Sequence, residues 1–169
     1  AVMPVVTSFV FLFRGLGLSY QEVVVALIGD NMSGFNQLKK FGVKLAFILA
    51  SSLILIAFTP LAEIWFRDVS GLSESLTEFA KLPLKIMSFF PALTVLISFQ
   101  RAVLVKANET KQITYGTAIE FVGIIIVVAI CIKYFSLVGA VAATIAFVIG
   151  RMAACGYLLP PTISSLKKN

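Results

Sequence analysis

The chain has 169 residues, of which 59% are hydrophobic and only 13% are charged, and its formal net charge is +6. A soluble domain averages about 45–50% apolar and about 25% charged residues, so a water-soluble fold of this composition would lack the polar surface to cover it. The lysines lie at the ends of apolar segments without interleaved aromatic residues, which favours lipid headgroups over nucleic acid as their partner. We therefore expect a multi-pass protein of a bacterial inner membrane or a plasma membrane.

Five apolar segments are each long enough to cross a bilayer. A transmembrane helix needs roughly 20 apolar residues to cross about 30 Å of hydrocarbon, and every backbone amide there has to be paired within the protein, which predicts helices. Residues 53–58 and 124–130 do not alternate as the strands of a membrane barrel would. The predicted fold class is all-α, a polytopic transmembrane helix bundle that forms one domain over residues 1–169. The spans are predicted near residues 4–28, 43–65, 79–104, 113–134 and 137–159.

The first residues, from Ala1 onward, already belong to the first predicted span. They carry neither the basic n-region nor the small-residue cleavage site of a signal peptide. We therefore expect the sequence to be a fragment whose upstream part is missing, and the alternative is N-terminal processing of a complete small protein.

Basic residues follow alternate spans. The intervening connectors offer only Arg67, beside acidic residues, and Lys133. Because basic residues collect on the cytoplasmic side of a membrane, the first, third and fifth spans are expected to end there. The lysines that indicate this are Lys39, Lys40 and Lys44 after the first span, Lys106 and Lys111 after the third, and Lys167 and Lys168 after the fifth.

The chain has no histidine, and its two cysteines, Cys131 and Cys155, both lie inside predicted spans. The commonest metal ligand and general base is therefore missing, and no cysteine cluster replaces it. No pair of acids shares a helix face at a spacing suited to catalysis. We expect no enzymatic activity, no metal, no cofactor and no disulfide framework.

Two lysines of the third span indicate a polar cavity. Ionisable side chains in hydrocarbon cost about 2.5–3.5 kcal/mol and normally face a cavity or a partner. Lys81 and Lys85 are four residues apart and share one face, and Pro83 and Pro91 predict a bend in this helix. A bent helix with two ammonium groups on one side is typical of the wall of an aqueous cavity for an anion. The alternative is that both lysines extend to the outer headgroups.

Further ionisable residues lie inside the other spans. Arg14 and Glu22 are eight residues apart, too far to pair directly, but both can line one cavity. Glu120 and Arg151 lie on adjacent spans and are predicted to form a buried pair, which either fixes the helix register or takes part in proton coupling. Arg101 is expected to anchor its helix at the interface. The balance is basic and favours an anion. The candidate substrate-binding residues are Arg14, Glu22, Lys81, Lys85, Glu120 and Arg151.

Small residues recur along the fifth span at spacings of four and three, which places them on one stripe. Small side chains let helix backbones approach closely in a membrane, so this stripe predicts a helix-packing face. Its members are Gly139, Ala143, Ala146, Gly150 and Ala153.

Several segments resemble parts of MATE-type transporters in order and spacing over nearly the whole chain. Residues 19–22 (Ser-Tyr-Gln-Glu), continuing through 26–31 (Ala-Leu-Ile-Gly-Asp-Asn), resemble the second or eighth helix of that family. Residues 108–111 (Asn-Glu-Thr-Lys) resemble the loop after the fourth or tenth, and residues 139–143 the start of the sixth or twelfth. Residues 82–91 (Leu-Pro-Leu-Lys-Ile-Met-Ser-Phe-Phe-Pro) resemble the progressive ankylosis family, a MATE-like branch of the multidrug/oligosaccharidyl-lipid/polysaccharide exporter superfamily.

The resemblance implies a transporter of two lobes, each with six helices, that works by alternating access. This chain would supply five helices of one lobe, and the basic tail at residues 164–169 indicates the C-terminal lobe. Its partners would be the bilayer, a small anionic solute and the missing N-terminal lobe. The family implies secondary-active efflux of an anion such as pyrophosphate, a nucleotide or citrate. The alternatives are a lipid-linked oligosaccharide flippase and a membrane scaffold that transports nothing.

Overall fold

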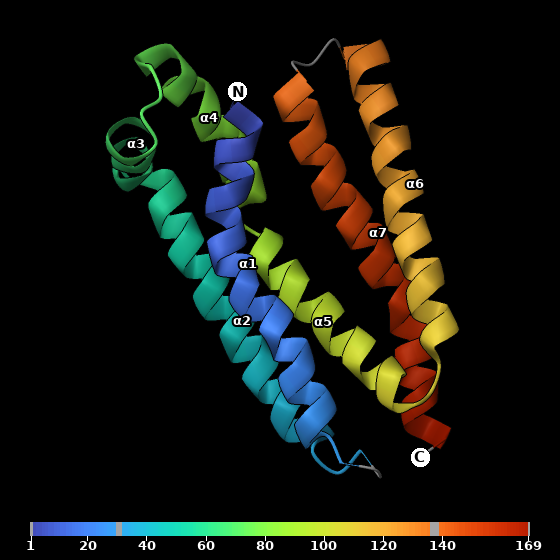
Figure 1. The fold of residues 1–169 in the computed structure, drawn as a ribbon. Helices are drawn as coiled ribbons and strands as arrows, with labels where there is room; N and C mark the ends of the chain where they lie inside the picture. The colour runs from blue at the N-terminus through green and yellow to red at the C-terminus, as the bar shows by residue number, and fades with distance from the viewer. Residues whose placement is uncertain (1, 30–31, 136–138, 169) are drawn as a thin grey trace.

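The computed structural model describes residues 2–29, 32–135 and 139–168. In these residues the chain is helical, without a β-strand, and the predicted all-α bundle is confirmed (Figure 1). The elements in chain order are α1 (Val2–Leu27), α2 (Phe35–Phe58), the short α3 (Leu61–Ile64), the π-helical turn η1 (Trp65–Val69), α4 (Glu74–Met87), α5 (Phe90–Lys106), α6 (Thr110–Phe135) and α7 (Gly139–Lys168).

The long helices run alternately up and down, so the connections fall at two ends of the bundle (Figure 1). The turn from α1 to α2, the turn from α5 to α6 and the end of α7 lie together, and we call this the basic end. The chain's first helix begins at the opposite end, where α3 and η1 also lie. Lys39 and Lys40 near the start of α2, and Lys106 and Lys111 around the α5–α6 turn, belong to the basic end. The lysines on which the predicted orientation depends therefore lie at one end of the bundle. The last connector was expected at residues 133–136, but α6 continues to Phe135, and residue 136 lies outside the described residues.

The second span begins and ends earlier than expected. Helix α2 covers Phe35–Phe58 rather than 43–65, with Lys39, Lys40 and Lys44 exposed inside it. It ends because Thr59 is extended, with φ −115° and ψ 168°, the conformation that a following proline favours. Trp65 therefore belongs to η1, where its ring lies 4.7 Å from that of Phe9 on α1. Sequence reasoning took the lysines as the end of the connector, although helices tolerate lysines on an exposed face.

The third span is a broken helix made of α4 and α5. The break lies at Ser88 and Phe89, directly before Pro91, whereas Pro83 lies inside α4. Proline at position 91 has no N–H to donate to the carbonyl of Met87, so the helix loses a hydrogen bond here. The expected bend is present, and Pro91 rather than Pro83 causes it. Phe90 is consequently the first residue of α5, midway between Glu74 and Lys106.

The last helix is longer than expected, since α7 continues through Pro160 and Pro161 to Lys168 instead of ending at residue 159. Side-chain hydroxyls support this segment: Thr162 Oγ1 donates to the carbonyl of Leu158 at 2.7 Å, and Ser165 Oγ donates to that of Pro161 at 2.9 Å. Two prolines remove backbone donors but fix φ at a helical value, and the helix persists.

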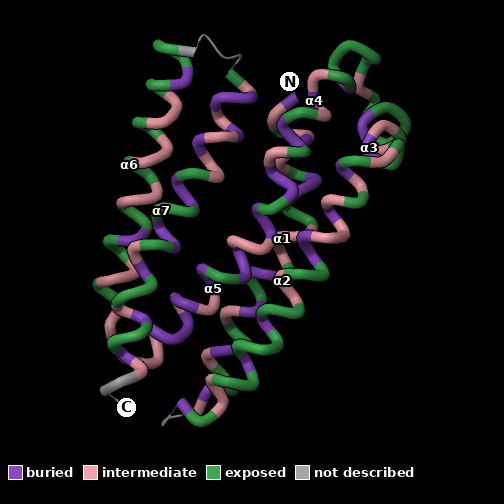
Figure 2. Tube along the Cα trace, turned by 180° about the vertical axis from the view of Figure 1, so that it is seen from behind, coloured by how far each residue is buried: buried purple, intermediate pink, exposed green. Residues whose placement is uncertain are grey.

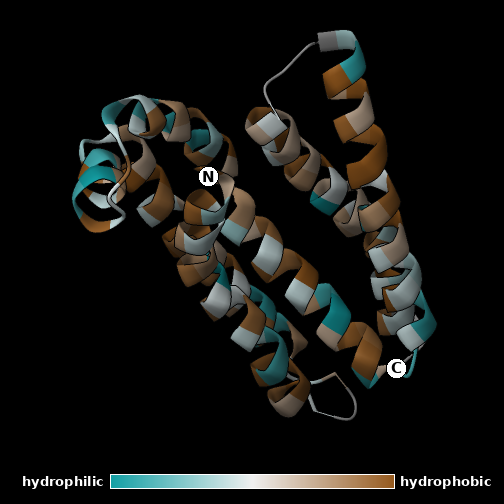
Figure 3. Cartoon of the chain, turned by 45° about the horizontal axis from the view of Figure 1, so that its top comes forward, coloured by the Kyte–Doolittle hydropathy of each residue, from teal (hydrophilic) through white to brown (hydrophobic). Residues whose placement is uncertain are grey.

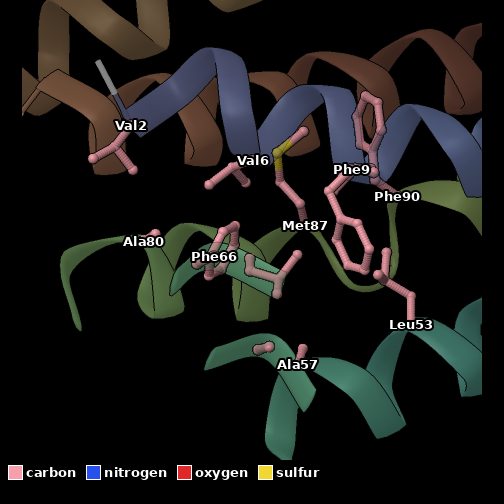
Figure 4. Packing of buried hydrophobic residues seen from close by; sticks show 12 residues of the cluster. Val2, Val6, Phe9, Leu53, Ala57, Phe66, Ala80, Met87 and Phe90 are labelled. Carbon is pink, nitrogen blue, oxygen red and sulfur yellow. The ribbon is translucent and has the colours of Figure 1, made fainter. Parts of the chain in front are cut away.

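Large apolar side chains cover the outside of the bundle as well as its core. The core between α1, α2, α4, η1 and the start of α5 contains Val6, Phe9, Phe66, Met87 and Phe90, and Figure 4 shows the first four of these gathered between the helices. Green, exposed positions follow the outer faces of the helices in Figure 2, and brown, hydrophobic residues cover much of the helices in Figure 3. In the described residues, five helices are long and apolar enough to cross a membrane, with α4 and α5 counted as one. Such a surface is stable against lipid tails rather than water.

Candidate functional site

The centre of the candidate site is an ion pair between α6 and α7. Nε of Arg151 lies 2.8 Å from Oε1 of Glu120, and the two side chains are only 10% and 13% exposed. The helices approach closely at Gly150, where a Cβ would lie 3.0 Å from the carbonyl oxygen of Glu120. The predicted buried pair is therefore present, and the small residue Gly150 belongs to the interface that brings its partners together.

A second arginine reaches the same carboxylate from α5. Nη2 of Arg101 lies 3.8 Å from Oε2 of Glu120 and donates a hydrogen bond of 3.2 Å to Oγ1 of Thr117, one turn earlier on α6. Sequence reasoning placed Arg101 at the interface as an anchor. The structure instead turns its side chain toward the interior, because the antiparallel return of α6 brings a carboxylate and a hydroxyl within reach of a residue near the end of α5.

A third arginine approaches from α1, across a buried aromatic ring. The guanidinium carbons of Arg14 and Arg151 lie 4.7 and 5.2 Å from the ring centroid of Phe90. A cation over an aromatic face is attracted by the ring quadrupole, more strongly when water is excluded. Arg14 also lies within electrostatic range of Arg151 and Glu120. Phe90, 2% exposed, thus supports two guanidinium groups from different helices.

We call Arg14, Arg101, Arg151 and Glu120 the arginine cluster, and its members on α1, α6 and α7 lie at mid-depth. Arg14 is at the middle of the 26-residue helix α1. Glu120 and Arg151 lie ten and twelve residues from the starts of α6 and α7, or about 15 and 18 Å along their helices. These distances are about half of the roughly 30 Å of hydrocarbon that a span crosses.

The arginine cluster carries more positive charge than its carboxylate balances. Three guanidinium groups face one carboxylate, which leaves a net charge of +2. The Nε atoms of all three arginines are buried, and none has a hydrogen-bond partner in the described part of the chain. The contact of Arg151 with Glu120 is thus an ion pair without the alignment of a hydrogen bond. Buried charge without compensation is costly, so the cluster is suited to a negatively charged ligand.

Lys81 and Lys85 lie in a different place, toward the end opposite the basic end. They line a cavity of about 270 Å³ together with Glu63 and the residues 57–60 and 62 at the α2–α3 corner. The Lys81 ammonium lies 3.2 Å from Oε2 of Glu63 and also pairs with Glu78. Lys85 is exposed and lies 5.3 Å from the ring centroid of Phe58. Both lysines thus line one hollow, and the charge of Lys81 is balanced there by carboxylates.

Glu22 does not join either group of charges. It is exposed, and two residues along a helix correspond to a rotation of roughly 200°, so it lies on the other side of α1 from the buried Tyr20 and Val24. It is also eight residues, about 12 Å along the helix, from Arg14. The structure therefore separates Glu22 from the arginine cluster, against the expectation that both acid and arginine line one cavity.

A third hollow is apolar and unsuited to an anion. A groove of about 280 Å³ runs between α2, α5 and α7, and Lys39 is its one charged lining residue in the described structure. Gln100 also lines it, and its Nε2 donates a hydrogen bond of 3.0 Å to the carbonyl of Cys155. This groove faces the hydrocarbon half that adjoins the basic end.

Sequence reasoning identified three of the four residues of the arginine cluster and missed the fourth and the ring that supports the cluster. Arg14, Glu120 and Arg151 were candidates, whereas Arg101 and the supporting ring of Phe90 were not. The position of Arg101 inside a predicted span was a signal that it could join the cluster, because a long side chain there can reach Glu120 on the following span. Phe90 is one of 15 phenylalanines, and no sequence pattern distinguishes it.

Comparison of the chain with protein-family models, with curated proteins and with solved structures finds no match. In the part of the chain that the structure describes, no group of His, Cys, Asp or Glu residues could hold a metal ion. The fold and the site therefore define a class only: a membrane-embedded helical bundle with a buried, net positive cluster of charged side chains at mid-depth.

Proposed function

We propose that the protein is a membrane transporter that binds a small organic or phosphate-type anion at the arginine cluster and exports it by alternating access. The proposal depends on one observation: three arginines gather around a single carboxylate in the middle of an apolar bundle. Guanidinium groups are always charged and bind carboxylate and phosphate oxygens through paired N–H donors. An anion that enters the cluster balances charge that the protein leaves unbalanced.

The arrangement of the helices supports a role in transport. Helix α1 lies close to α7 at the end opposite the basic end, where Thr144 Oγ1 is 3.6 Å from Sδ of Met3, and the two helices separate toward the basic end, where α5 crosses between them (Figure 1). The arginine cluster joins these helices, because Arg14 comes from α1, Arg151 from α7 and Phe90 from α5. An anion held by both arginines would draw α1 and α7 together, and its release would let them separate.

The resemblance of residues 82–91 and the other quoted segments to MATE-like transporters supports the same function. On this proposal the chain is the C-terminal lobe of such a transporter, close to the progressive ankylosis family, and works with an N-terminal lobe in a bacterial inner membrane or a plasma membrane. The cavity lined by Lys81 and Lys85 would be the outer vestibule through which the anion leaves.

Flux from proteoliposomes loaded with labelled phosphate, pyrophosphate or citrate tests this function. Arg151→Gln and Arg14→Gln should each reduce flux by about tenfold or more, because a hydrogen bond to a charged group contributes about 1.5–3 kcal/mol. Lys44→Gln, at an exposed position of α2, is the matched control and should retain wild-type flux. Flux equal to that of protein-free liposomes, or equal in all variants, would contradict the proposal. Movement of a lipid-linked sugar instead would establish the flippase alternative.

A further inference from the structure

Glu120 occupies the position that a bound anion would take. Its two carboxylate oxygens face arginines on two other helices, with Oε1 2.8 Å from Nε of Arg151 on α7 and Oε2 3.8 Å from Nη2 of Arg101 on α5. A carboxylate whose two oxygens meet different guanidinium groups shows how carboxylates and phosphates are commonly held in proteins. The contacts of the Glu120 carboxylate therefore indicate how an acidic group of a ligand would contact Arg151 and Arg101.

The charge that remains after this pairing specifies the ligand further. With Glu120 ionised the arginine cluster has a net charge of +2, since Arg14 and one further arginine are unbalanced. A monovalent anion would leave one buried positive charge, and a trivalent anion would add a buried negative one. Only a divalent anion brings the charge of the site to zero, and the cost of buried net charge makes this difference large.

We infer that Glu120 sets the charge selectivity of the site: the arginine cluster takes a divalent oxyanion or dicarboxylate, which competes with Glu120 for Arg151 and Arg101. This inference rests on the proposed function, because it assumes that the cluster binds an anion. It goes further in naming the charge of the ligand and the residue that determines it.

Three further acids, on α1, α3 and α4, lie away from the arginine cluster. Glu63 and Glu78 pair with Lys81 at the far end of α4, and Glu22 is exposed on α1, about 12 Å along the helix from Arg14. Phe90 contributes an apolar surface beneath Arg14 and Arg151 and no group that competes for the ligand. Removing the charge of Glu120 therefore changes the charge of the arginine cluster and leaves the pairs of Glu63 and Glu78 with Lys81 unchanged.

The test is equilibrium titration of the purified protein with nitrate, sulfate and citrate at constant ionic strength, because salt screens charge interactions. Wild-type protein should bind sulfate at least about tenfold more tightly than nitrate. Glu120→Gln, which is close in size, should bind sulfate about tenfold more tightly than wild type and should bind trivalent citrate most tightly. Glu120→Asp keeps the charge and should keep the wild-type order. Glu74→Gln, at an exposed position at the start of α4, is the control.

The outcomes separate this inference from the proposed function. If folded wild-type protein binds none of the three anions saturably, the proposed function itself is wrong. If wild type binds anions and Glu120→Gln shows the same affinities and the same order, the inference is overturned while the function stands. Should Glu120→Gln not fold, wild type and Glu120→Asp decide the matter, because equal affinity for nitrate and sulfate in either protein overturns the inference.

Discussion

Arg14 and Arg151, from the first and the last helix, share the ring of Phe90, with their guanidinium carbons 4.7 and 5.2 Å from its centroid. Two like charges approach one ring because its face attracts both and because Glu120 partly balances them. The ring is therefore an energetic link between helices that are distant in sequence.

Phe90→Leu should destabilise the protein, since it removes a buried ring and its attraction to two cations. A double-mutant cycle with Arg14→Met isolates the second effect, for which we expect a coupling of about 0.5–2 kcal/mol from unfolding in detergent. Phe89→Leu, at a neighbouring ring that is 59% exposed, is the control and should show no coupling to Arg14. Additive effects of Phe90→Leu and Arg14→Met would show that the ring and the arginine do not interact.

Removing one partner of the Glu120–Arg151 pair should lower the free energy of unfolding much more than replacing both partners by apolar residues. Glu120→Ala leaves three buried arginines without a carboxylate and should cost about 3–5 kcal/mol of unfolding free energy, whereas Glu120→Met combined with Arg151→Met should cost less than Glu120→Ala alone. The more exposed pair of Glu63 and Lys81, with side chains 45% and 26% exposed, should contribute about 1 kcal/mol or less. Equal costs for breaking the two pairs would contradict the burial of Glu120.

Gly42 allows α1 and α2 to pack around Tyr20. The Tyr20 hydroxyl donates a hydrogen bond of 2.6 Å to the carbonyl of Leu38, and a Cβ at position 42 would lie 2.6 Å from the same hydroxyl. Gly42→Ala should therefore destabilise the protein by about 1–3 kcal/mol, measured by thermal unfolding, and Tyr20→Phe in the same chain should relieve part of that loss. Gly156→Ala is the control: a Cβ there meets nothing within 4 Å, so the higher helix propensity of alanine should leave stability equal or raised.

Substitution of Gly150 by alanine, at the interface of α6 and α7, should be as destabilising as Gly42→Ala. A Cβ there would lie 2.7 Å from Cγ1 of Ile124 and 3.0 Å from the backbone oxygen of Glu120. Because one of these atoms belongs to the backbone, Gly150→Ala should move α6 and reduce anion binding together with stability. Gly139→Ala, where a Cβ meets nothing within 4 Å, should change neither property. A stable Gly150→Ala protein with wild-type binding would show that the close approach of the helices is unnecessary.

The sequence was sufficient to predict the membrane bundle and the existence of five spans. In a chain with so little charge, long apolar runs are expected to form transmembrane helices rather than a soluble core. The proximity of Glu120 to Arg151 follows from the short connection between their spans. The bounds of the second span were wrong because Lys39 and Lys40 suggested a connector, while Pro60 was the signal that mattered.

The composition of the arginine cluster was less predictable than its existence. Whether Arg101 extends to the interface or turns inward depends on the rotation of α5 against α6, which no pattern along the chain specifies. The stripe of small residues on α7 was only partly informative for the same reason: Ala146 and Gly150 are buried, whereas Gly139 and Ala153 are exposed. Glu22 was grouped with Arg14 because spacing alone does not show which side of a helix meets the core.

Anomalous diffraction from crystals of the protein soaked in selenate, a divalent oxyanion with a heavy atom, tests the central claim most directly. We expect one selenium peak beside Phe90, positioned so that the selenate oxygens accept hydrogen bonds from the Arg14 and Arg151 guanidinium groups, and no such peak in Arg151→Gln crystals. Selenate bound only to lysines at the basic end, with the arginine cluster unoccupied in well-ordered crystals, would contradict it.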